Sequence, residues 1–301
     1  MTIDVQHVSK MFGSIRGVDD LSFTVPDGKV TGFLGPNGAG KSTTMRLMLG
    51  LDRGQGRTLF DGRALTDYAH ASKVVGTHLD ARPFLPGRSA RDHLLMLGAD
   101  ARVSNARIDE VLATVGLADV ARRRPKTFSL GMAQRLGLAG AILAKPQALM
   151  LDEPANGLDP QSIQWLREFL RHYASQGHAV LVSSHLLSEM QLMADHVVVI
   201  ARGRLVAEGA VEELSARGSD VLVRTDDVAR LRAALKARGA TVSDEGGNAL
   251  GVSGLGRDDV GRVAFESGCI VFELSERRAS LEETFLQLTG DGQEFAFGET
   301  P

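Results

Sequence analysis

The sequence predicts an α/β protein in two parts, with residues 1–216 in the first, residues 217–290 in a smaller α+β part, and a tail at 291–301. Three observations support this prediction. Short apolar runs alternate with longer amphipathic runs, as they do where buried strands alternate with helices. A glycine-rich segment at 35–43 joins one apolar run to a helical one. After about Glu208 the pattern changes to a shorter series of strands and helices.

The strands of the first part are predicted at short apolar runs, which are residues 21–25, 30–34, 148–151, 179–183 and 197–201. Several are apolar almost throughout, as expected for strands that are buried on both faces of a largely parallel sheet. The stretch from about 84 to 145 has helical periodicity instead, with amphipathic runs at 90–97, 105–115 and 132–143. We interpret this stretch as a helical insertion.

The second part begins after a short helix at 211–216 and has its own order of elements. We expect a strand at 221–224, a helix at 228–238, a hairpin around Gly246-Gly247-Asn248, a helix at 258–266, a strand at 269–274 and a helix at 281–288. Strand-helix-strand-strand-helix-strand is the order of a ferredoxin-like domain. A structural role and a regulatory or dimer-stabilising role both stay open, and the tail is expected to be poorly ordered.

Composition and charge exclude several classes of protein. With 301 residues, 43% of them apolar and 24% charged, the chain can bury a sizeable core. The net charge of −3 and the scattered basic residues give no footprint for nucleic acid. The longest uncharged apolar runs, at 136–144 and 196–201, fall short of the roughly 20 residues that span a bilayer. The N-terminus shows no secretory signal, and a single cysteine, Cys269, suits a reducing cytoplasm.

The glycine-rich segment has the composition of a phosphate-binding loop. It reads Gly35-Pro36-Asn37-Gly38-Ala39-Gly40-Lys41-Ser42-Thr43, follows an apolar strand and opens a helical run at 44–49. Glycines let backbone N–H groups point at a phosphate, and the helix N-terminus adds its positive dipole end. Lys41 would bridge the β- and γ-phosphates, and the Ser42 hydroxyl would ligate Mg²⁺. A plain glycine-rich turn is the alternative, which the strand-loop-helix context disfavours.

Two adjacent carboxylates end a second apolar strand, in the sequence Ala148-Leu149-Met150-Leu151-Asp152-Glu153. In a doubly wound sheet the functional residues lie at the carboxyl ends of the strands, next to the bound phosphates. Asp152 would hold Mg²⁺, directly or through water, and Glu153 would polarise the attacking water. A solvated acidic turn is the alternative.

With these residues in hand, the chain resembles the ATP-binding subunit of ABC transporters, and most closely the ABC-2-type branch that exports antibiotics and drugs. The resemblance runs from about residue 2 to residue 215 and consists of several motifs in order. It implies a P-loop nucleoside triphosphatase fold, a RecA-like core with an N-terminal antiparallel β part and a helical insertion. In this family the phosphate loop and the acidic pair are the Walker A and Walker B motifs.

The resemblance also assigns roles to residues outside these two motifs. Phe12 matches the aromatic residue that stacks on adenine. The segment Asn156-Gly157-Leu158-Asp159 matches the D-loop, whose aspartate, Asp159, faces the partner subunit. His185 matches the switch histidine that senses the γ-phosphate.

The signature segment of the family is represented by Phe128-Ser129-Leu130-Gly131-Met132. The common form is Leu-Ser-Gly-Gly-Gln, so this segment keeps Ser129 and Gly131 and departs at three positions. A hydroxyl and a glycine N–H at the start of a helix suit an anion. The resemblance implies that each ATP lies between Lys41 of one chain and Ser129 of the other in a head-to-tail dimer.

Asp80 stands where the family usually has a glutamine that contacts Mg²⁺ and water. The segment Val75-Gly76-Thr77-His78-Leu79-Asp80 leads to that position. A carboxylate there would approach the metal, but it would repel the γ-phosphate when the metal is absent. The alternative is a turn residue before Arg82-Pro83.

Taken together, the residues and the resemblance predict an ATP hydrolase that uses Mg²⁺ and powers export of a drug, antibiotic or similar small molecule. The resemblance implies a separate integral-membrane permease, a docking groove near 82–91, a homodimer in the ATP-bound state and a location at the inner face of the cell membrane. One rival is an ABC-type ATPase acting on ribosomes or DNA, which usually has two ATPase units or a long coiled coil. The other is a small-molecule kinase or a GTPase, whose guanine-reading motif is absent from the sequence.

Overall fold

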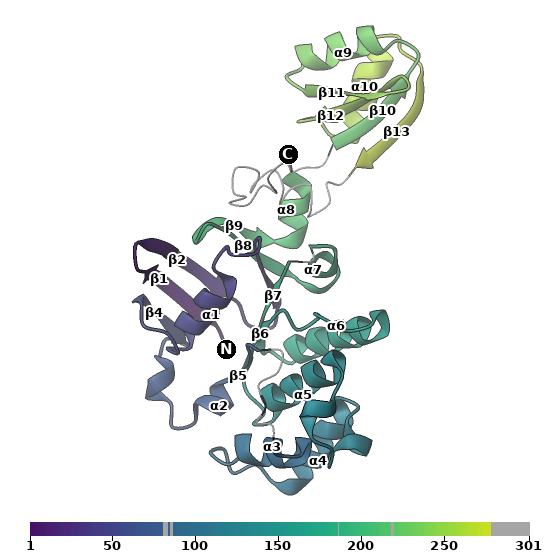
Figure 1. Cartoon of the computed structure of the whole chain (residues 1–301). Helices are drawn as coiled ribbons and strands as arrows, with labels where there is room; N and C mark the ends of the chain where they lie inside the picture. The colour runs from purple at the N-terminus through teal and green to yellow at the C-terminus, as the bar shows by residue number, and fades with distance from the viewer. Residues whose placement is uncertain (81–83, 85–86, 186, 218–219, 278–301) are drawn as a thin grey trace, which may run out of the picture. The chain divides into compact units, whose positions relative to one another are not determined.

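The computed structural model describes residues 1–80, 84, 87–185, 187–217 and 220–277. These residues form two units, one covering Met1–Ala210 and the other beginning at Val211 (Figure 1). The helix α8, Val211–Arg217, therefore belongs to the second unit, whereas the sequence groups 211–216 with the first. The helix predicted at 281–288 and the tail at 291–301 lie outside the described residues.

A six-stranded sheet forms the centre of the first unit, in the order β5-β6-β7-β3-β8-β9. Its strands are β3 (Val30–Leu34), β5 (Val75–His78), β6 (Ala148–Asp152), β7 (Ala179–Ser184), β8 (His196–Ala201) and β9 (Arg204–Ala210). All neighbours are parallel except β8 and β9, which form an antiparallel pair. Every residue of β3 and of β7 is buried, so both faces of these strands are covered, as predicted.

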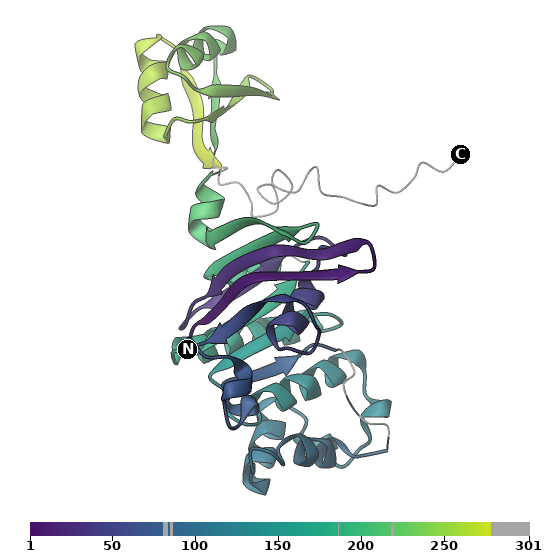
Figure 2. The same cartoon turned by 90° about the vertical axis from the view of Figure 1, so that its left-hand side faces the viewer.

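A separate antiparallel sheet has the order β2-β1-β4, with β1 at Ile3–Phe12, β2 at Ile15–Val25 and β4 at Gln55–Phe60. The run at 21–25, which the sequence groups with the core strands, is the end of β2 and lies in this sheet. Its burial alternates because only one face of the sheet meets the core. The Asp19 N–H donates to Gly203 O at 2.8 Å, so β2 adjoins the turn between β8 and β9 (Figure 2).

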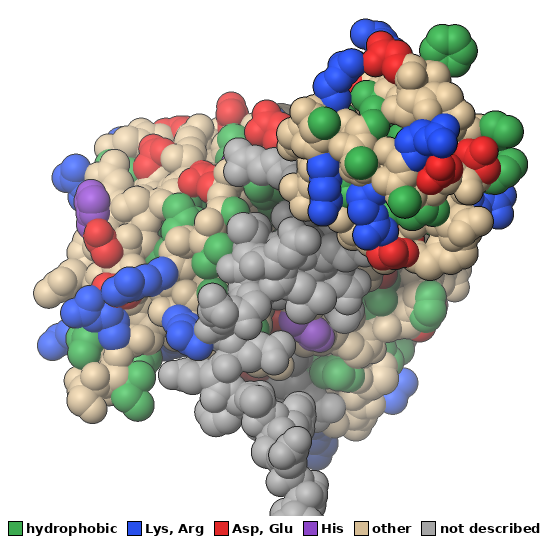
Figure 3. Space-filling view, turned by 90° about the horizontal axis from the view of Figure 1, so that it is seen from above, with side chains coloured by type: hydrophobic (Ala, Val, Ile, Leu, Met, Phe, Trp, Pro, Cys, Tyr) green, Lys and Arg blue, Asp and Glu red, His purple; other side chains and the backbone are tan. Residues whose placement is uncertain are grey.

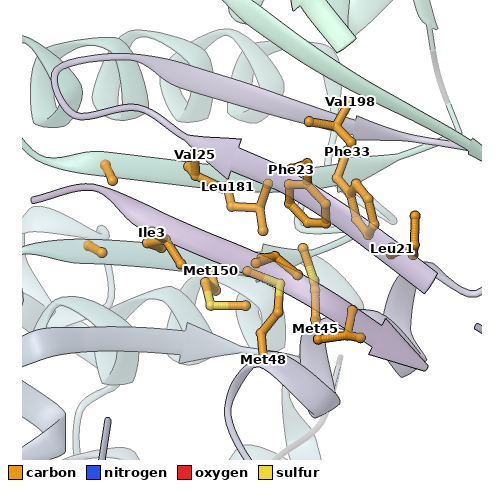
Figure 4. Close-up of a cluster of buried hydrophobic side chains, with 14 of the residues drawn as sticks. Ile3, Leu21, Phe23, Val25, Phe33, Met45, Met48, Met150, Leu181 and Val198 are labelled. Atoms are coloured by element: carbon orange, nitrogen blue, oxygen red, sulfur yellow. The ribbon is translucent and has the colours of Figure 1, made fainter. Parts of the chain in front are cut away.

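The main core of the first unit fills the space between the two sheets and α1, Lys41–Met48 (Figure 4). The rings of Phe23 and Phe33 stack there with centroids 5.4 Å apart, and Met45 and Met48 of α1 pack into the same cluster. This packing fixes the strand before the phosphate loop and the helix after it. That helix begins at Lys41, three residues earlier than predicted.

Three of the remaining helices of the first unit, α3 (Ala90–Leu97), α4 (Asn105–Thr114) and α5 (Leu130–Ile142), form the predicted insertion and lie together at one end of that unit (Figure 1). The other α-helices are α2 (Ala71–Val74), α6 (Pro160–Ser175) and α7 (Leu187–Met193), and the 3₁₀ turns are Leu65–Asp67, Ala118–Val120 and Pro125–Thr127. The helix α5 lies directly against β5, because a Cβ added to Gly76 would come within 2.8 Å of the Ala141 carbonyl carbon.

The second unit contains a four-stranded antiparallel sheet in the order β11-β12-β10-β13. Its elements are β10 (Asp220–Thr225), α9 (Val228–Ala237), β11 (Thr241–Gly246), β12 (Ala249–Ser253), α10 (Arg257–Glu266) and β13 (Val271–Arg277). The elements follow the predicted order of strand, helix, strand, strand, helix and strand. Cys269 belongs to the core of this unit, and β13 starts two residues after it rather than at it.

No helix in the described part of the chain is long and apolar enough to cross a membrane. On the face seen in Figure 3, lysine and arginine side chains are interspersed with aspartate and glutamate. That distribution matches the scattered basic residues of the sequence.

Candidate active site

The phosphate loop runs from the end of β3 to the start of α1 and depends on two of its glycines. Gly40 precedes α1 with φ of 102°, and a Cβ there would lie 2.7 Å from Gly17 O. A Cβ on Gly35 would lie 2.6 Å from Ile200 O. Cβ atoms do not come this close to backbone oxygens, so both positions exclude any side chain.

A pocket of about 420 Å³ opens over this loop. It is lined by Phe12, Ile15, Gly17 and Glu153 together with the loop residues Asn37, Gly38, Ala39, Gly40, Lys41, Ser42 and Thr43. Phe12 is 52% exposed, so part of its side chain is accessible from the pocket. The structure therefore brings together the predicted aromatic residue, the phosphate loop and the second of the two carboxylates.

Lys41 is buried, and its ammonium lies between the loop and the acidic pair. Its Nζ donates to Gly35 O at 2.7 Å and to Pro36 O at 3.3 Å, and lies 3.8 Å from Glu153 Oε1. Burial lowers the pKa of Lys41, and the charges of Glu153 and Asp152 oppose this effect. The two carboxylates thus favour the charged form that phosphate binding needs.

One buried hydroxyl, that of Ser183, holds both members of the acidic pair. Ser183 of β7 pairs with Asp152 in the sheet register, and its Oγ donates to Asp152 Oδ1. The same oxygen accepts the Glu153 N–H at 2.9 Å. The sequence analysis missed this residue, although a serine inside a wholly buried apolar strand is a signal, because such a hydroxyl requires a partner.

Glu153 lies between a cation and an imidazole. His185 Nδ1 is 2.7 Å from Glu153 Oε2, while Lys41 faces the other carboxylate oxygen. Glu153 also has φ of 48°, in the left-handed region that non-glycine residues rarely adopt. Such backbone geometry concentrates at functional sites. A carboxylate held in this way beside a phosphate-binding loop can accept a proton from an attacking water.

Ser129, Gly131 and Asp159 do not line this pocket but form a second cluster. Ser129 precedes α5, and its Oγ accepts the Met132 N–H at 3.2 Å, so the helix starts two residues earlier than predicted. Asp159 precedes α6, and its Oδ1 accepts the Ser162 N–H at 2.7 Å. The hydrogen bonds from Ser162 hold the pKa of Asp159 below its usual range. Ser129 and Asp159 thus each stabilise the N-terminus of a helix.

Asp80 follows β5 and lines a different pocket, of about 380 Å³, together with Leu51, His93 and Leu97. It is not among the residues that line the phosphate-loop pocket. Asp80 and Asp152 both lie near His78, where their charges raise its pKa against the larger effect of burial. Its role as a magnesium ligand stays a prediction.

A hydrogen-bonded chain that the sequence analysis missed connects β5, α5 and the D-loop. His78 is 2% exposed, and its Nε2 donates to Gln134 Oε1. The Gln134 amide in turn donates to Asn156 O at 3.3 Å. Burial lowers the pKa of His78, which favours a neutral ring, and a Cβ on Gly137 would lie 2.8 Å from its Nε2. The histidine therefore fills a space that Gly137 leaves open.

Comparisons with known proteins identify the family. The chain is 37% identical to the uncharacterized ABC transporter ATP-binding protein YhcH of Bacillus subtilis (strain 168), over 97% of this chain and 97% of that protein. This chain belongs to the ABC transporter ATP-binding proteins. The ABC transporter family model matches its residues 18–156, and residues 219–282 match a model described only as a domain of unknown function.

Two further relatives of this ABC ATP-binding protein align along nearly the whole chain. The bacitracin transport ATP-binding protein BcrA of Bacillus licheniformis is 34% identical over 96% of this chain and 98% of its own length. The daunorubicin resistance ATP-binding protein DrrA3 of Streptomyces coeruleorubidus is 35% identical over 96% of both. A solved ATP-binding subunit of an ABC transporter superposes with a TM-score of 0.65 at 26% identity, covering 71% of this chain and 92% of its own.

Membership of this family confirms the prediction of a transporter ATPase subunit over the two alternatives, an ABC-type ATPase acting on ribosomes or DNA and a small-molecule kinase or GTPase. The chain is an ATP-binding and ATP-hydrolysing subunit of an ABC transporter with the mixed α/β fold of that family. The pocket over Lys41 is the part of the fold that suits the triphosphate, and Glu153 is the carboxylate beside it. The roles of individual residues are taken up below.

Proposed function

We propose that this ABC ATP-binding protein powers export of a drug, antibiotic or similar small molecule by closing a head-to-tail dimer around two ATP molecules. The observation that supports the dimer is that the two helix N-termini suited to phosphate, those of α1 and α5, do not share a pocket. The pocket over Lys41 is lined without Ser129, which instead stands exposed at the start of α5. A second exposed anion site is suited to the nucleotide of another copy. Relatives named for bacitracin transport and daunorubicin resistance support the class of cargo.

Within each site, different residues of the chain have different roles in binding and hydrolysis. The loop N–H groups and Lys41 bind the phosphates, Phe12 stacks on the adenine, and Glu153 accepts the proton of the attacking water. His185 keeps the Glu153 carboxylate oriented through its 2.7 Å contact and senses the γ-phosphate. The differential affinity of ATP and ADP for the closed dimer is what drives movement in the transporter.

Mg²⁺ fits the oxygen donors at this site. Ser42 lines the pocket, and Asp152 ends the strand beside it with its carboxylate held by Ser183. Magnesium sites of this kind use one or two protein oxygens together with the phosphates and waters. Ser42 and Asp152 would hold the ion, which neutralises phosphate charge when bound. Asp80 is the third proposed donor, on the family resemblance alone, because it lines the other pocket and not this one.

We also propose that a separate integral-membrane permease docks in the 380 Å³ pocket between the insertion and the core. Leu51 and Leu97 line it and are 58% and 44% exposed. Exposed apolar side chains in a hollow suit an apolar segment of a partner. The predicted groove at 82–91 falls partly outside the described residues, and the pocket is lined by 75–80, His93 and Leu97 instead. Docking there would place the chain at the inner face of the cell membrane.

The dimer and the role of Glu153 are tested together by Glu153→Gln. The variant keeps the shape of the side chain but cannot accept a proton, so we expect it to bind ATP, form a stable dimer and lose hydrolysis. Light scattering after size exclusion measures the dimer, and phosphate release measures the rate. Glu168→Gln on the exposed face of α6 is the control and should behave as wild type. Hydrolysis at the wild-type rate by Glu153→Gln would contradict the assignment.

The docking proposal is tested with Leu97→Glu. We expect this change to abolish co-purification of a multi-span protein from membranes, while the ATPase rate of the isolated subunit stays unchanged. Leu192→Glu is the control, because Leu192 is 54% exposed and does not line the pocket. Equal retention of the partner by both variants would rule out this surface.

A further inference from the structure

Leu130 occupies the signature position where the common form of the family has glycine, and its side chain lies on the D-loop of the same chain. A Cβ added to Gly157 would lie 2.5 Å from Leu130 Cγ and closer still to its Cδ2. Gly157 also has φ of 76°, in the left-handed region. The residue at 157 must therefore be glycine for two separate reasons, one conformational and one set by the size of Leu130.

The same face of α5 makes further contacts with the D-loop and the helix after it. A Cβ on Gly131 would lie 3.4 Å from Gly157 O. Gln134 donates to Asn156 O at 3.3 Å, and Arg135 Nη2 donates to Ser162 Oγ at 2.5 Å. Positions 130, 131, 134 and 135 are neighbours on one helix face, so the first two turns of α5 form a continuous seat.

The seat also reaches the catalytic carboxylate. The Asn156 N–H donates to Glu153 O at 3.1 Å, so a turn links Glu153 to the D-loop. The Leu158 N–H donates to Ala155 O at 3.1 Å and continues that turn. A shift of the D-loop on α5 would therefore be transmitted to the backbone of Glu153.

We propose that Leu130 is a positioning residue that seats the D-loop on the signature helix of its own chain. Ser129 and Asp159 are then presented to the partner subunit as one surface with a fixed spacing. This inference rests on the proposed ATP-dependent dimer. On this inference, leucine in place of glycine at position 130 has a function of its own. Its side chain leaves no room for a Cβ at position 157, so Leu130 and Gly157 fit only as a pair.

A double-mutant cycle tests the pair, with Gly157→Ala, Leu130→Gly and the two combined. Gly157→Ala alone should lower kcat about tenfold and weaken the ATP-dependent dimer of the Glu153→Gln background by a similar factor. The KM for ATP should change little, because neither Leu130 nor Gly157 lines the pocket over Lys41. Leu130→Gly should restore at least threefold of the loss in the combined variant, since it removes every Leu130 side-chain atom near position 157.

Gly177→Ala is the matched control for backbone strain. Gly177 has φ of 88°, and a Cβ there would meet nothing within 4 Å, so this variant reports the cost of the left-handed conformation alone. It should lower the unfolding midpoint but leave kcat and dimer formation unchanged. An equal loss of kcat in Gly177→Ala and Gly157→Ala would overturn the inference.

The outcomes separate this inference from the proposed function. If Glu153→Gln forms no dimer with ATP, the proposed function fails, and the cycle is read from the unfolding midpoint and from kcat. Additive effects of the two substitutions on both the unfolding midpoint and kcat would overturn the inference that Leu130 positions the D-loop. Coupling in the midpoint without any rescue of kcat would show packing without positioning, and would overturn it as well.

Discussion

Replacing Ser183 by alanine should damage the site and the fold together, because its hydroxyl makes two hydrogen bonds at once. It donates to the Asp152 carboxylate and accepts the Glu153 N–H at 2.9 Å. The serine is wholly buried at the end of β7, where water does not replace the hydroxyl easily. Alanine leaves the carboxylate with one donor fewer and the N–H without its partner.

The structure sets the size of the effect. A hydrogen bond to a charged group contributes about 1.5–3 kcal/mol, and an unpaired buried N–H costs about 1–3 kcal/mol. Asp152 and Glu153 are half-buried rather than fully buried, so water recovers part of this, and we expect a loss of about 2–3 kcal/mol. For a unit of this size that corresponds to a fall in the unfolding midpoint of about 4–12 °C. A freed Glu153 should also lower kcat about tenfold.

Calorimetry of the full chain measures the midpoint of the first unit, and phosphate release measures kcat. Thr31→Val is the matched control, because the Thr31 hydroxyl is also wholly buried in the sheet but has no hydrogen-bond partner among the described residues. Its replacement should change the midpoint by no more than about 1–2 °C. If Ser183→Ala and Thr31→Val shift the midpoint equally, burial rather than the two hydrogen bonds explains the serine, and the reasoning fails.

Three further predictions concern single residues. Asp159→Ala should destabilise the first unit by about 1 kcal/mol through loss of the α6 cap while Asp159→Asn keeps that stability, as measured by calorimetry. His185→Ala should lower kcat at least tenfold, with ADP affinity in a fluorescence titration unchanged, because it contacts Glu153 rather than the loop. Acidification below pH about 6.5 should destabilise the fold, because burial lowers the folded-state pKa values of His78 and His93, so the unfolded chain binds more protons there. His93→Gln should reduce the fall in midpoint between about pH 7.5 and 5.5, and an unchanged fall would exclude His93 as a source.

The sequence predicts those parts of the site in which the chemistry lies in consecutive residues. The loop at 35–43 needs glycines, a lysine and a hydroxyl in one segment, and its context of strand and helix is local as well. Asp152 and Glu153 are adjacent at the end of one strand. Each segment carries its own local geometry. The loop and Glu153 line one pocket because the parallel strands β3 and β6 end at the same edge of the sheet.

The parts that sequence reasoning missed depend on contacts between segments far apart in the chain. Ser183 acts on Asp152 because β6 and β7 are neighbours in register, and no local pattern states that pairing. His78 meets Gln134 only because α5 approaches β5 where Gly137 leaves room. The run at 21–25 failed in a similar way, since a short apolar run does not reveal which of two sheets it joins.

The three departures from the common signature illustrate the same limit. Phe128 is buried, so its side chain packs inside the protein. Leu130 fits against Gly157, and Met132 contributes its N–H to the Ser129 cap, a contact that does not depend on the side chain. The groups suited to a phosphate, the Ser129 hydroxyl and the backbone N–H groups of the first turn, are therefore independent of all three replaced side chains. If Ser129 binds a phosphate as proposed, the variant signature keeps the groups for it, and the Leu130 side chain adds the contact with Gly157 of the D-loop.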